Sequence, residues 1–78
     1  MQLAGPKQIK MARYALGLTV RELAERAQIQ PNTISRIENG HQAFAGTLEK
    51  ITKVLEEAGA VFIDNETQCG VLVDKHKR

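Results

Sequence analysis

Hydrophobic residues recur every three or four positions over most of the chain, which is the spacing of one face of an α-helix. After Pro6, this spacing links Ile9, Ala12 and Leu16. Proline suits the first helical position because its missing N–H would have no partner there. Gly17 can adopt the left-handed conformation that often ends a helix. The pattern therefore predicts a first helix between Pro6 and Gly17.

The second predicted helix begins after Thr19. Thr19 and Glu22 form a T-x-x-E capping box, in which each side chain can accept a hydrogen bond from the other residue's backbone N–H. Leu18 and Leu23 occupy the two positions of a hydrophobic staple, one before the cap and one inside the helix. Both signals place the helix start at the same point.

The third predicted helix runs from Pro31 to the Asn39-Gly40 pair. Gln30 occupies the cap position, Pro31 is the first helical residue, and Ile34 lies where a staple needs its partner. Asn and Gly commonly end helices, so this helix has barely two turns.

A fourth helix is predicted after the loop at 41–46, with Thr47 as its cap and Gly59 as its end. Its apolar stripe consists of Leu48, Ile51, Leu55 and Ala58, with Val54 at the edge.

The hydrophobic period changes after residue 59. The segments "AVFID" and "GVLVD" are rich in β-branched residues and flank the polar "NETQC", which predicts a β-hairpin with a loop of about five residues. Both faces of the hairpin are then apolar. The expected register places Val61, Ile63, Val71 and Val73 on one face, and Phe62 and Leu72 on the other.

Because both faces of this hairpin are apolar, helices on one side leave the other side uncovered. Two hairpins from two chains, paired edge to edge, would supply the missing surface. We therefore expect a homodimer whose interface is formed by the hairpin together with the fourth helix and contains Val61, Phe62, Ile63, Val71, Leu72 and Val73.

The third helix has an outer face made of hydrogen-bonding side chains. At about 100° per residue, Ile34 and Ile37 face inward while Asn32 and Arg36 lie almost opposite. An amide can bond adenine, an arginine can bond guanine, and a hydroxyl can bond a base or a phosphate. An ordinary solvated helix face is the alternative. The surrounding helices decide between the two interpretations.

Two capped helices joined by the tight connection 27–30, the second of them short, form the layout of a helix-turn-helix. The run "ALGLTVRELAERAQIQPNTISRIENG" resembles the lambda-repressor-like, Xre/Cro-type family of DNA-binding domains. The resemblance covers about residues 6–58. It implies a mainly α fold, a lambda-repressor-like helical bundle with a helix-turn-helix, here followed by a C-terminal two-stranded β-hairpin. Some family members use a C-terminal β-segment in dimerisation.

The resemblance also implies roles for individual side chains. Positions that read bases in the family correspond to Gln30, Asn32, Thr33 and Arg36, with Ser35 at the margin. Positions that contact phosphate correspond to Thr19 and Arg21, and to the loop that contains Asn39, His41 and Gln42. The sequence departs from the family at Gln28, where glycine is usual, at Val20, where a polar contact is common, and at Pro31, which replaces a side chain that often reads a base.

Arg13 and Glu38 resemble a pair that the family uses structurally. Each lies about 40° from an apolar position of its own helix, Arg13 beside Ile9 and Glu38 beside Ile34. Half-buried charges need partners. We therefore predict a salt bridge between Arg13 and Glu38, which makes Glu38 structural and not a DNA contact.

Aromatic residues outside these motifs have two interpretations each. Tyr14, with Lys7 and Lys10, falls on the exposed side of the first helix, as a solvated face or as a phosphate contact. Phe44 is interpreted as a core residue under its loop, with base stacking as the alternative, because a small core needs its few aromatic side chains.

The charge is unevenly distributed along the 78 residues, which suffice for one small core. The net charge is +2, but residues 1–46 hold six basic and three acidic side chains, whereas residues 47–78 hold five basic and six acidic ones. An anionic partner would be attracted by the first half of the chain.

Metal, redox and membrane functions find no support in the sequence. Cys69 is the one cysteine, and His41 and His76 do not complete a zinc ligand set with it. No apolar run has the length of a signal peptide or a membrane span. No nucleophile accompanies a base at a recognisable spacing. We expect a cytoplasmic, prokaryotic or phage-encoded protein that needs no cofactor and is not an enzyme.

The sequence therefore predicts a DNA-binding domain at 1–59, a dimerisation hairpin at 60–74 and a disordered tail at 75–78. The expected function is a transcriptional regulator, a repressor that binds an inverted repeat in double-stranded DNA as a homodimer. Two alternatives remain: an antitoxin that autoregulates its operon while neutralising a protein partner, and a protein-interaction adaptor that does not bind DNA.

Overall fold

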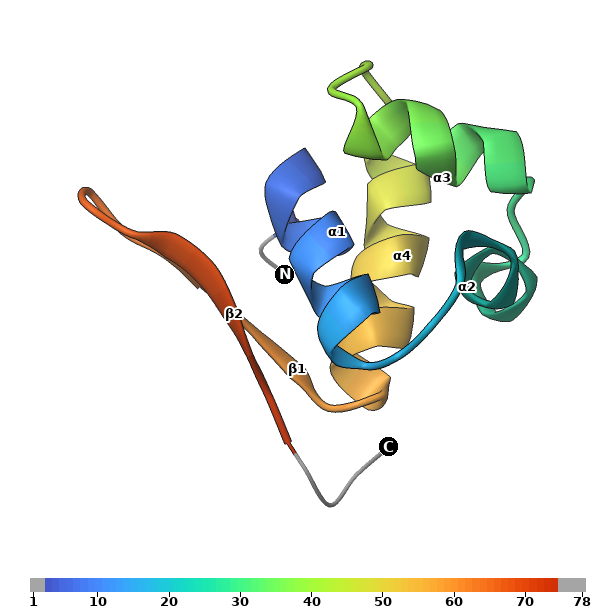
Figure 1. The fold of residues 1–78 in the computed structure, drawn as a ribbon. Helices are drawn as coiled ribbons and strands as arrows, with labels where there is room; N and C mark the ends of the chain where they lie inside the picture. Colours follow the sequence, from blue (N-terminus) through green and yellow to red (C-terminus); the bar gives the residue numbers. More distant parts are fainter. Residues whose placement is uncertain (1–2, 75–78) are drawn as a thin grey trace.

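Four helices pack around a common core, and a two-stranded hairpin lies at one side of them (Figure 1). A computed structural model describes residues 3–74, so the predicted tail at 75–78 lies outside the described residues. The predicted four helices and C-terminal hairpin are confirmed. Their bounds are α1 (Pro6–Ala15), α2 (Val20–Ala27), α3 (Pro31–Glu38), α4 (Ala45–Glu57), β1 (Ala60–Asp64) and β2 (Cys69–Val73).

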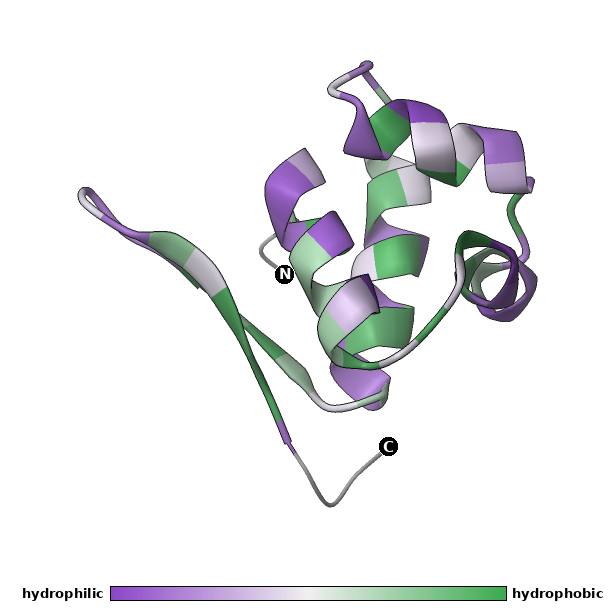
Figure 2. Cartoon of the chain, in the orientation of Figure 1, coloured by the Kyte–Doolittle hydropathy of each residue, from purple (hydrophilic) through white to green (hydrophobic). Residues whose placement is uncertain are grey.

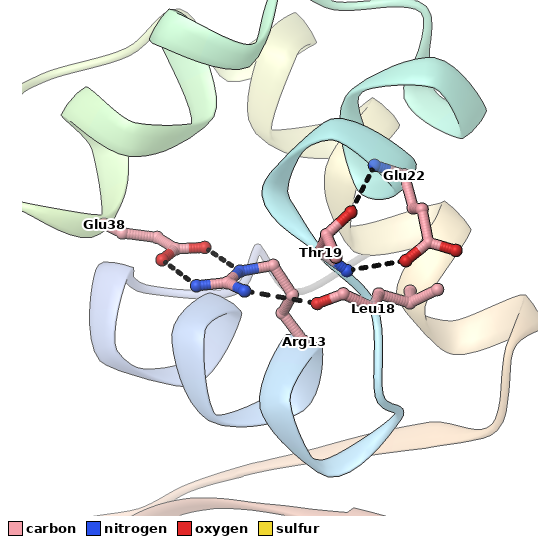
Figure 3. Close-up of polar contacts among 5 residues, drawn as sticks. All are labelled: Arg13, Leu18, Thr19, Glu22 and Glu38. Atoms are coloured by element: carbon pink, nitrogen blue, oxygen red, sulfur yellow. Dashed lines mark hydrogen bonds and ion pairs between the residues drawn. The ribbon is translucent and has the colours of Figure 1, made fainter.

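Three of the four helix starts follow the predicted signals. Pro6 and Pro31 are the first residues of α1 and α3. The backbone N–H of Glu22 donates to Thr19 Oγ1 at 3.0 Å, and the N–H of Thr19 donates to Glu22 Oε1 at 2.9 Å, so the predicted capping box is present (Figure 3). Gly17 ends the first helical segment with a φ of 71°, in the left-handed region.

The predicted start of α4 at Thr47 is wrong. The helix begins at Ala45, because the carbonyl of Phe44 already accepts the N–H of Leu48 at 3.1 Å. Phe44 is extended, with φ −66° and ψ 147°, and no side chain caps the helix. A cap that uses only the backbone leaves no polar side chain to recognise in the sequence.

The core is built by apolar side chains from all four helices. Burying each one removes its surface from water and contributes roughly 1.5–3 kcal/mol. The largest of those with less than 2% of their surface exposed are Ile9, Leu23, Ile34, Ile51 and Leu55. Phe62, Val71 and Val73 of the hairpin pack against this core, and Ala60 is buried beside it.

The predicted register of the hairpin is wrong by one residue. The pairs are Ala60 with Val73, Val61 with Leu72, Phe62 with Val71, Ile63 with Gly70, and Asp64 with Cys69, so the loop has four residues, 65–68. A slip of one residue exchanges the two faces of a strand. Phe62 therefore shares the inner face with Val71 and Val73, while Leu72 shares the outer face with Val61 and Ile63.

Asn65 explains the shorter loop. Its side-chain Oδ1 accepts the backbone N–H groups of Thr67 at 3.0 Å and Gln68 at 2.9 Å, and its own N–H donates to the Gln68 carbonyl at 2.9 Å. An asparagine side chain that bonds the backbone ahead of it favours a tight turn. Cys69 is thereby the first residue of β2 and not part of the loop.

Two buried polar side chains were not predicted, and both connect distant segments. Gln8, 3% exposed, accepts the Gly5 N–H at 2.9 Å and donates to the carbonyls of Ile63 at 2.9 Å and Gly70 at 3.2 Å. It therefore fastens the hairpin to α1. Thr52 on α4 is fully buried, and its hydroxyl accepts the N–H of Ala4 at 3.1 Å.

The predicted salt bridge between Arg13 and Glu38 is present (Figure 3). The guanidinium donates from Nε to Glu38 Oε2 at 2.8 Å and from Nη2 to Oε1 at 2.9 Å, while Nη1 donates to the Leu18 carbonyl at 3.2 Å. The two side chains are 9% and 6% exposed. Hydrogen bonding to Glu38 raises the pKa of Arg13 further above its ordinary value, so Arg13 stays charged.

Gln28 holds the connection between α2 and α3 in a left-handed conformation. Its φ is 57° and its ψ 48°, and it is the one non-glycine residue with positive φ among residues 3–74. The N–H of Ile29 can then donate to the Ala24 carbonyl at 2.9 Å, which closes the end of α2. A side chain with a Cβ in this region costs about 1–2 kcal/mol.

Replacing Gln28 with glycine is expected to stabilise the protein by about 0.5–1 kcal/mol, because glycine adopts positive φ without that cost but loses more entropy on folding. Thermal unfolding followed by circular dichroism should show a melting temperature a few degrees higher. Gln28→Ala is the matched control: it keeps the Cβ and should change little. Equal melting temperatures for the glycine and alanine variants would contradict the inference that a Cβ strains the backbone at position 28.

Removing either partner of the ion pair is expected to destabilise the fold strongly. Arg13→Met and Glu38→Met should each cost about 3 kcal/mol, because each leaves one buried charge without its partner. The double variant should lose much less than the sum of the two single losses. Urea unfolding of the wild type, the two single variants and the double variant measures these free energies of unfolding. Additive losses would show that the two side chains act independently.

Candidate nucleic-acid interface

The outer face of α3 carries polar side chains over an apolar inner face. Ile34 and Ile37 are buried, at 0% and 2% exposure, and attach the helix to α1 and the rest of the core. Figure 2 shows hydrophilic residues along the outward sides of α2 and α3, on the side of α1 away from the hairpin. The predicted base-reading residues lie here. Gln30, Asn32, Ser35 and Arg36 are exposed, while Thr33 is only partly exposed.

The charge of α3 on this outer face is positive. The first turn holds no acidic residue, so the positive end of the helix dipole is not neutralised by its own side chains. Glu38, the one acidic residue of the helix, is turned toward Arg13 and almost wholly buried. Arg36 is therefore the only full charge that α3 exposes on this face.

α2 packs against α3, and Thr19 and Arg21 at the start of α2 are exposed. Within the capping box, the backbone N–H groups of Thr19 and Glu22 are already bonded. Hydrogen bonding of the Glu22 carboxylate to the Thr19 backbone first, and to the Thr19 side chain second, lowers the pKa of Glu22 and keeps it ionised.

The loop after α3 is anchored to the end of that helix. The His41 N–H donates to the Arg36 carbonyl at 3.0 Å, and His41 Nδ1 lies 3.1 Å from the same oxygen. Gly40 has a φ of 93°, which turns the chain sharply. Asn39, His41 and Gln42 are all exposed on this loop. The three predicted phosphate-contacting residues of the loop thus stand next to the last turn of α3.

The prediction that Phe44 is a core residue is wrong. Its side chain is 87% exposed, the largest value among the exposed large hydrophobic residues of segment 3–74. The aromatic ring is not needed under the loop because Leu48 and Ala43 pack against the core there. Tyr14 is exposed as predicted, at 66%, and the Arg13 guanidinium lies 4.6 Å from the centre of its ring.

Two helices joined at Gln28, with a polar second helix held outward by buried isoleucines, form the geometry of a helix-turn-helix. A family model described as helix-turn-helix matches residues 9–59, about two thirds of the chain. The chain belongs to the helix-turn-helix family. It is of the lambda-repressor and Xre-like type, and in general terms a DNA-binding transcriptional regulator. A comparison with curated proteins gave no significant match.

Among residues 3–74, no three His, Cys, Asp or Glu side chains are grouped so that they could hold a metal ion. None of the helices in this range is long and apolar enough to cross a membrane.

Thr19 allows the structural and the DNA-binding roles of one side chain to be separated. Thr19→Ala should destabilise the protein by about 1 kcal/mol, because it removes the cap of α2. Thr19→Asp should retain stability, since aspartate is also a good cap, but its negative charge should weaken binding to DNA of any sequence where a phosphate lies nearby. Thermal unfolding and fluorescence anisotropy with labelled duplexes measure the two effects. Unchanged DNA affinity of the aspartate variant would exclude a phosphate at this position.

Proposed function

We propose that this protein represses transcription by binding an inverted repeat in double-stranded DNA as a homodimer, with α3 in the major groove. The observation that carries the proposal is the composition of the α3 outer face: amides, hydroxyls and one arginine, with the only carboxylate of the helix bound to Arg13. Such a face can bond base edges, and it contains no exposed acid that would repel phosphates.

The base-reading roles follow from side-chain chemistry and position. Asn32 and Arg36 are four residues apart and both exposed, so they project together from one side of α3. An amide pairs with the N6 and N7 edge of adenine, and a guanidinium with the O6 and N7 edge of guanine. Gln30 and Ser35 extend the same surface at its two sides. Thr33, partly exposed, would contact a base through its methyl or hydroxyl group at the margin.

The phosphate contacts are proposed on either side of α3. Arg21 and Thr19 at the start of α2 would contact one stretch of backbone, and Asn39, His41 and Gln42 a second stretch. The loop contains no lysine or arginine, so it adds little electrostatic affinity. A single domain should therefore bind weakly, and specific affinity requires two domains.

A two-fold dimer joined through the hairpin suits the dimensions of DNA. Two half-sites lie about 34 Å apart, so each α3 must lie about 17 Å from the two-fold axis. The hairpin packs on α1 and the end of α4, on the opposite side of α1 from α3 (Figure 1). The folded chain measures 29 × 28 × 20 Å, which accommodates that distance between its two ends. Repression is the simplest outcome because so small a protein has little surface left for polymerase.

The base-reading role of Arg36 can be tested against the phosphate role of Arg21. Selection of bound fragments from random duplex DNA first provides the preferred site and its symmetry. Arg36→Ala should then cost about 1–3 kcal/mol on that site and relax the preference at one base position in each half-site. Arg21→Ala should weaken specific and random DNA alike and reduce the dependence of affinity on salt. Affinities come from anisotropy titrations at several salt concentrations.

The two arginine variants serve as controls for each other, since both side chains are exposed and neither belongs to the core. Equal losses of Arg36→Ala on specific and random DNA would contradict base reading by α3. A selected site without two-fold symmetry would contradict binding as a dimer to an inverted repeat.

A further inference from the structure

The strand β2 has an open edge whose hydrogen-bonding groups can be assigned from the register. The hairpin closes with a bond from Asn65 N–H to the Gln68 carbonyl and another from Asp74 N–H to the Gly59 carbonyl. Hydrogen-bonded pairs alternate along an antiparallel ladder, so the pairs 61–72 and 63–70 are the bonded ones. The N–H and C=O groups of Cys69, Val71 and Val73 therefore point away from β1. Among residues 3–74, none of these groups has a hydrogen-bond partner.

A groove runs beside this edge and is partly apolar. It is lined by Cys69 of β2 and by Lys7, Lys10, Met11 and Tyr14 of α1. Met11 and Tyr14 are 40% and 66% exposed, which is high for large hydrophobic side chains. An additional strand bonded to β2 would lie over these α1 side chains. The edge and the groove therefore form one surface that a strand can occupy.

The outer face of the hairpin adds to this surface. Leu72 is 61% exposed, and on the same face Gly70 leaves open space, since a Cβ built there would meet no atom within 4 Å. Leu72 protrudes from this face, and Gly70, two residues away, has no side chain. When two copies of the strand pair, the leucine of each copy can pack into the open space at the glycine of the other.

We propose that the occupant is β2 of a second copy of this chain, running antiparallel with the two-fold axis at Val71. In this register Val71 faces Val71 of the second copy, and Cys69 faces Val73 of the second copy, so all three outward-pointing residues of each strand are hydrogen-bonded. Gly70 then lies opposite Leu72 of the second copy. The result is a continuous four-stranded sheet with Met11 and Tyr14 of both copies under its centre.

The charges agree with a second copy as the occupant. Residues 69–73 contain no charged side chain, so two β2 strands can align without repulsion between like charges.

The β1 edge is a weaker alternative for the same pairing. It carries the charged Asp64 among its outward-pointing residues, and α1 packs against β2, so a strand added to β1 would leave Met11 and Tyr14 exposed. The assignment of the β2 edge rests on the proposed function, because it assumes the homodimer. It adds which surface of the chain joins the two copies.

Disulfide trapping tests the register directly. In a Cys69→Ser background, Gly70→Cys and Leu72→Cys chains carrying different tags are co-expressed and then oxidised. Directly opposed residues in a non-hydrogen-bonded antiparallel pair are about 4.5 Å apart between Cα atoms, within the range of a disulfide. The mixture should give a covalent dimer that contains both tags, while either variant expressed alone should give none. Val61→Cys, on the same face of β1, is the matched control and should form no crosslink with either.

Each other result overturns the assignment. Crosslinking of Leu72→Cys or Gly70→Cys with itself indicates a different register, and crosslinking through Val61→Cys indicates pairing elsewhere on the hairpin. Sedimentation of the wild-type chain, run in parallel, distinguishes failure of the β2 assignment from failure of the homodimer itself. A dimer without the mixed crosslink refutes the β2 edge alone, whereas a monomer at high micromolar concentration refutes the homodimer as well.

A second pair of variants tests the interface without new cysteines. Leu72→Asp should convert the dimer to a monomer and weaken binding to the symmetric site more than tenfold, while Val61→Asp should leave both unchanged. The two side chains pair within the hairpin and are similarly exposed, at 61% and 58%, so neither change should unfold the monomer. Circular dichroism checks the fold. Equal effects of the two variants on the dimer would contradict pairing through β2.

Discussion

The position of α3 depends on the buried ion pair between Arg13 and Glu38. The same guanidinium also bonds the Leu18 carbonyl, so one side chain joins α1, the entry to α2 and the end of α3. The pair has an electrostatic consequence as well. A carboxylate on a helix that faces DNA would repel phosphates, but Glu38 is neutralised by Arg13 and kept away from the outer surface. Stability and the capacity to approach a polyanion therefore come from a single contact.

Local sequence signals predicted most of the fold because they act within a few residues. Pro6, Pro31 and the Thr19–Glu22 box each place a helix start from side chains adjacent to it. The start of α4 was missed because Phe44 caps it through its backbone alone. The strand register was missed because it depends on Asn65, whose two bonds to the loop backbone shorten the turn. An asparagine at the start of a hairpin loop is a sequence signal for a tight turn.

For the candidate site, helical periodicity was enough to identify exposed side chains on α3, since it depends only on which residues face the core. It could not identify residues whose environment is set by distant segments. Gln8 is buried only because the hairpin, 55 and 62 residues further along the chain, brings two carbonyls to its amide. Phe44 is exposed only because Leu48 and Ala43 already pack against the core in that region. Neither outcome follows from a residue's own neighbours in the sequence.

The amide of Gln8 is a direct polar link between the helices and the hairpin, since it bonds both strands and the turn that precedes α1. Such a link restricts rotation of the hairpin relative to α3. In a dimer joined through the hairpin, the separation of the two reading helices would then be nearly constant. The protein should therefore discriminate among operators by the number of base pairs between their half-sites. The length of the spacer would then affect binding even though no side chain contacts the spacer.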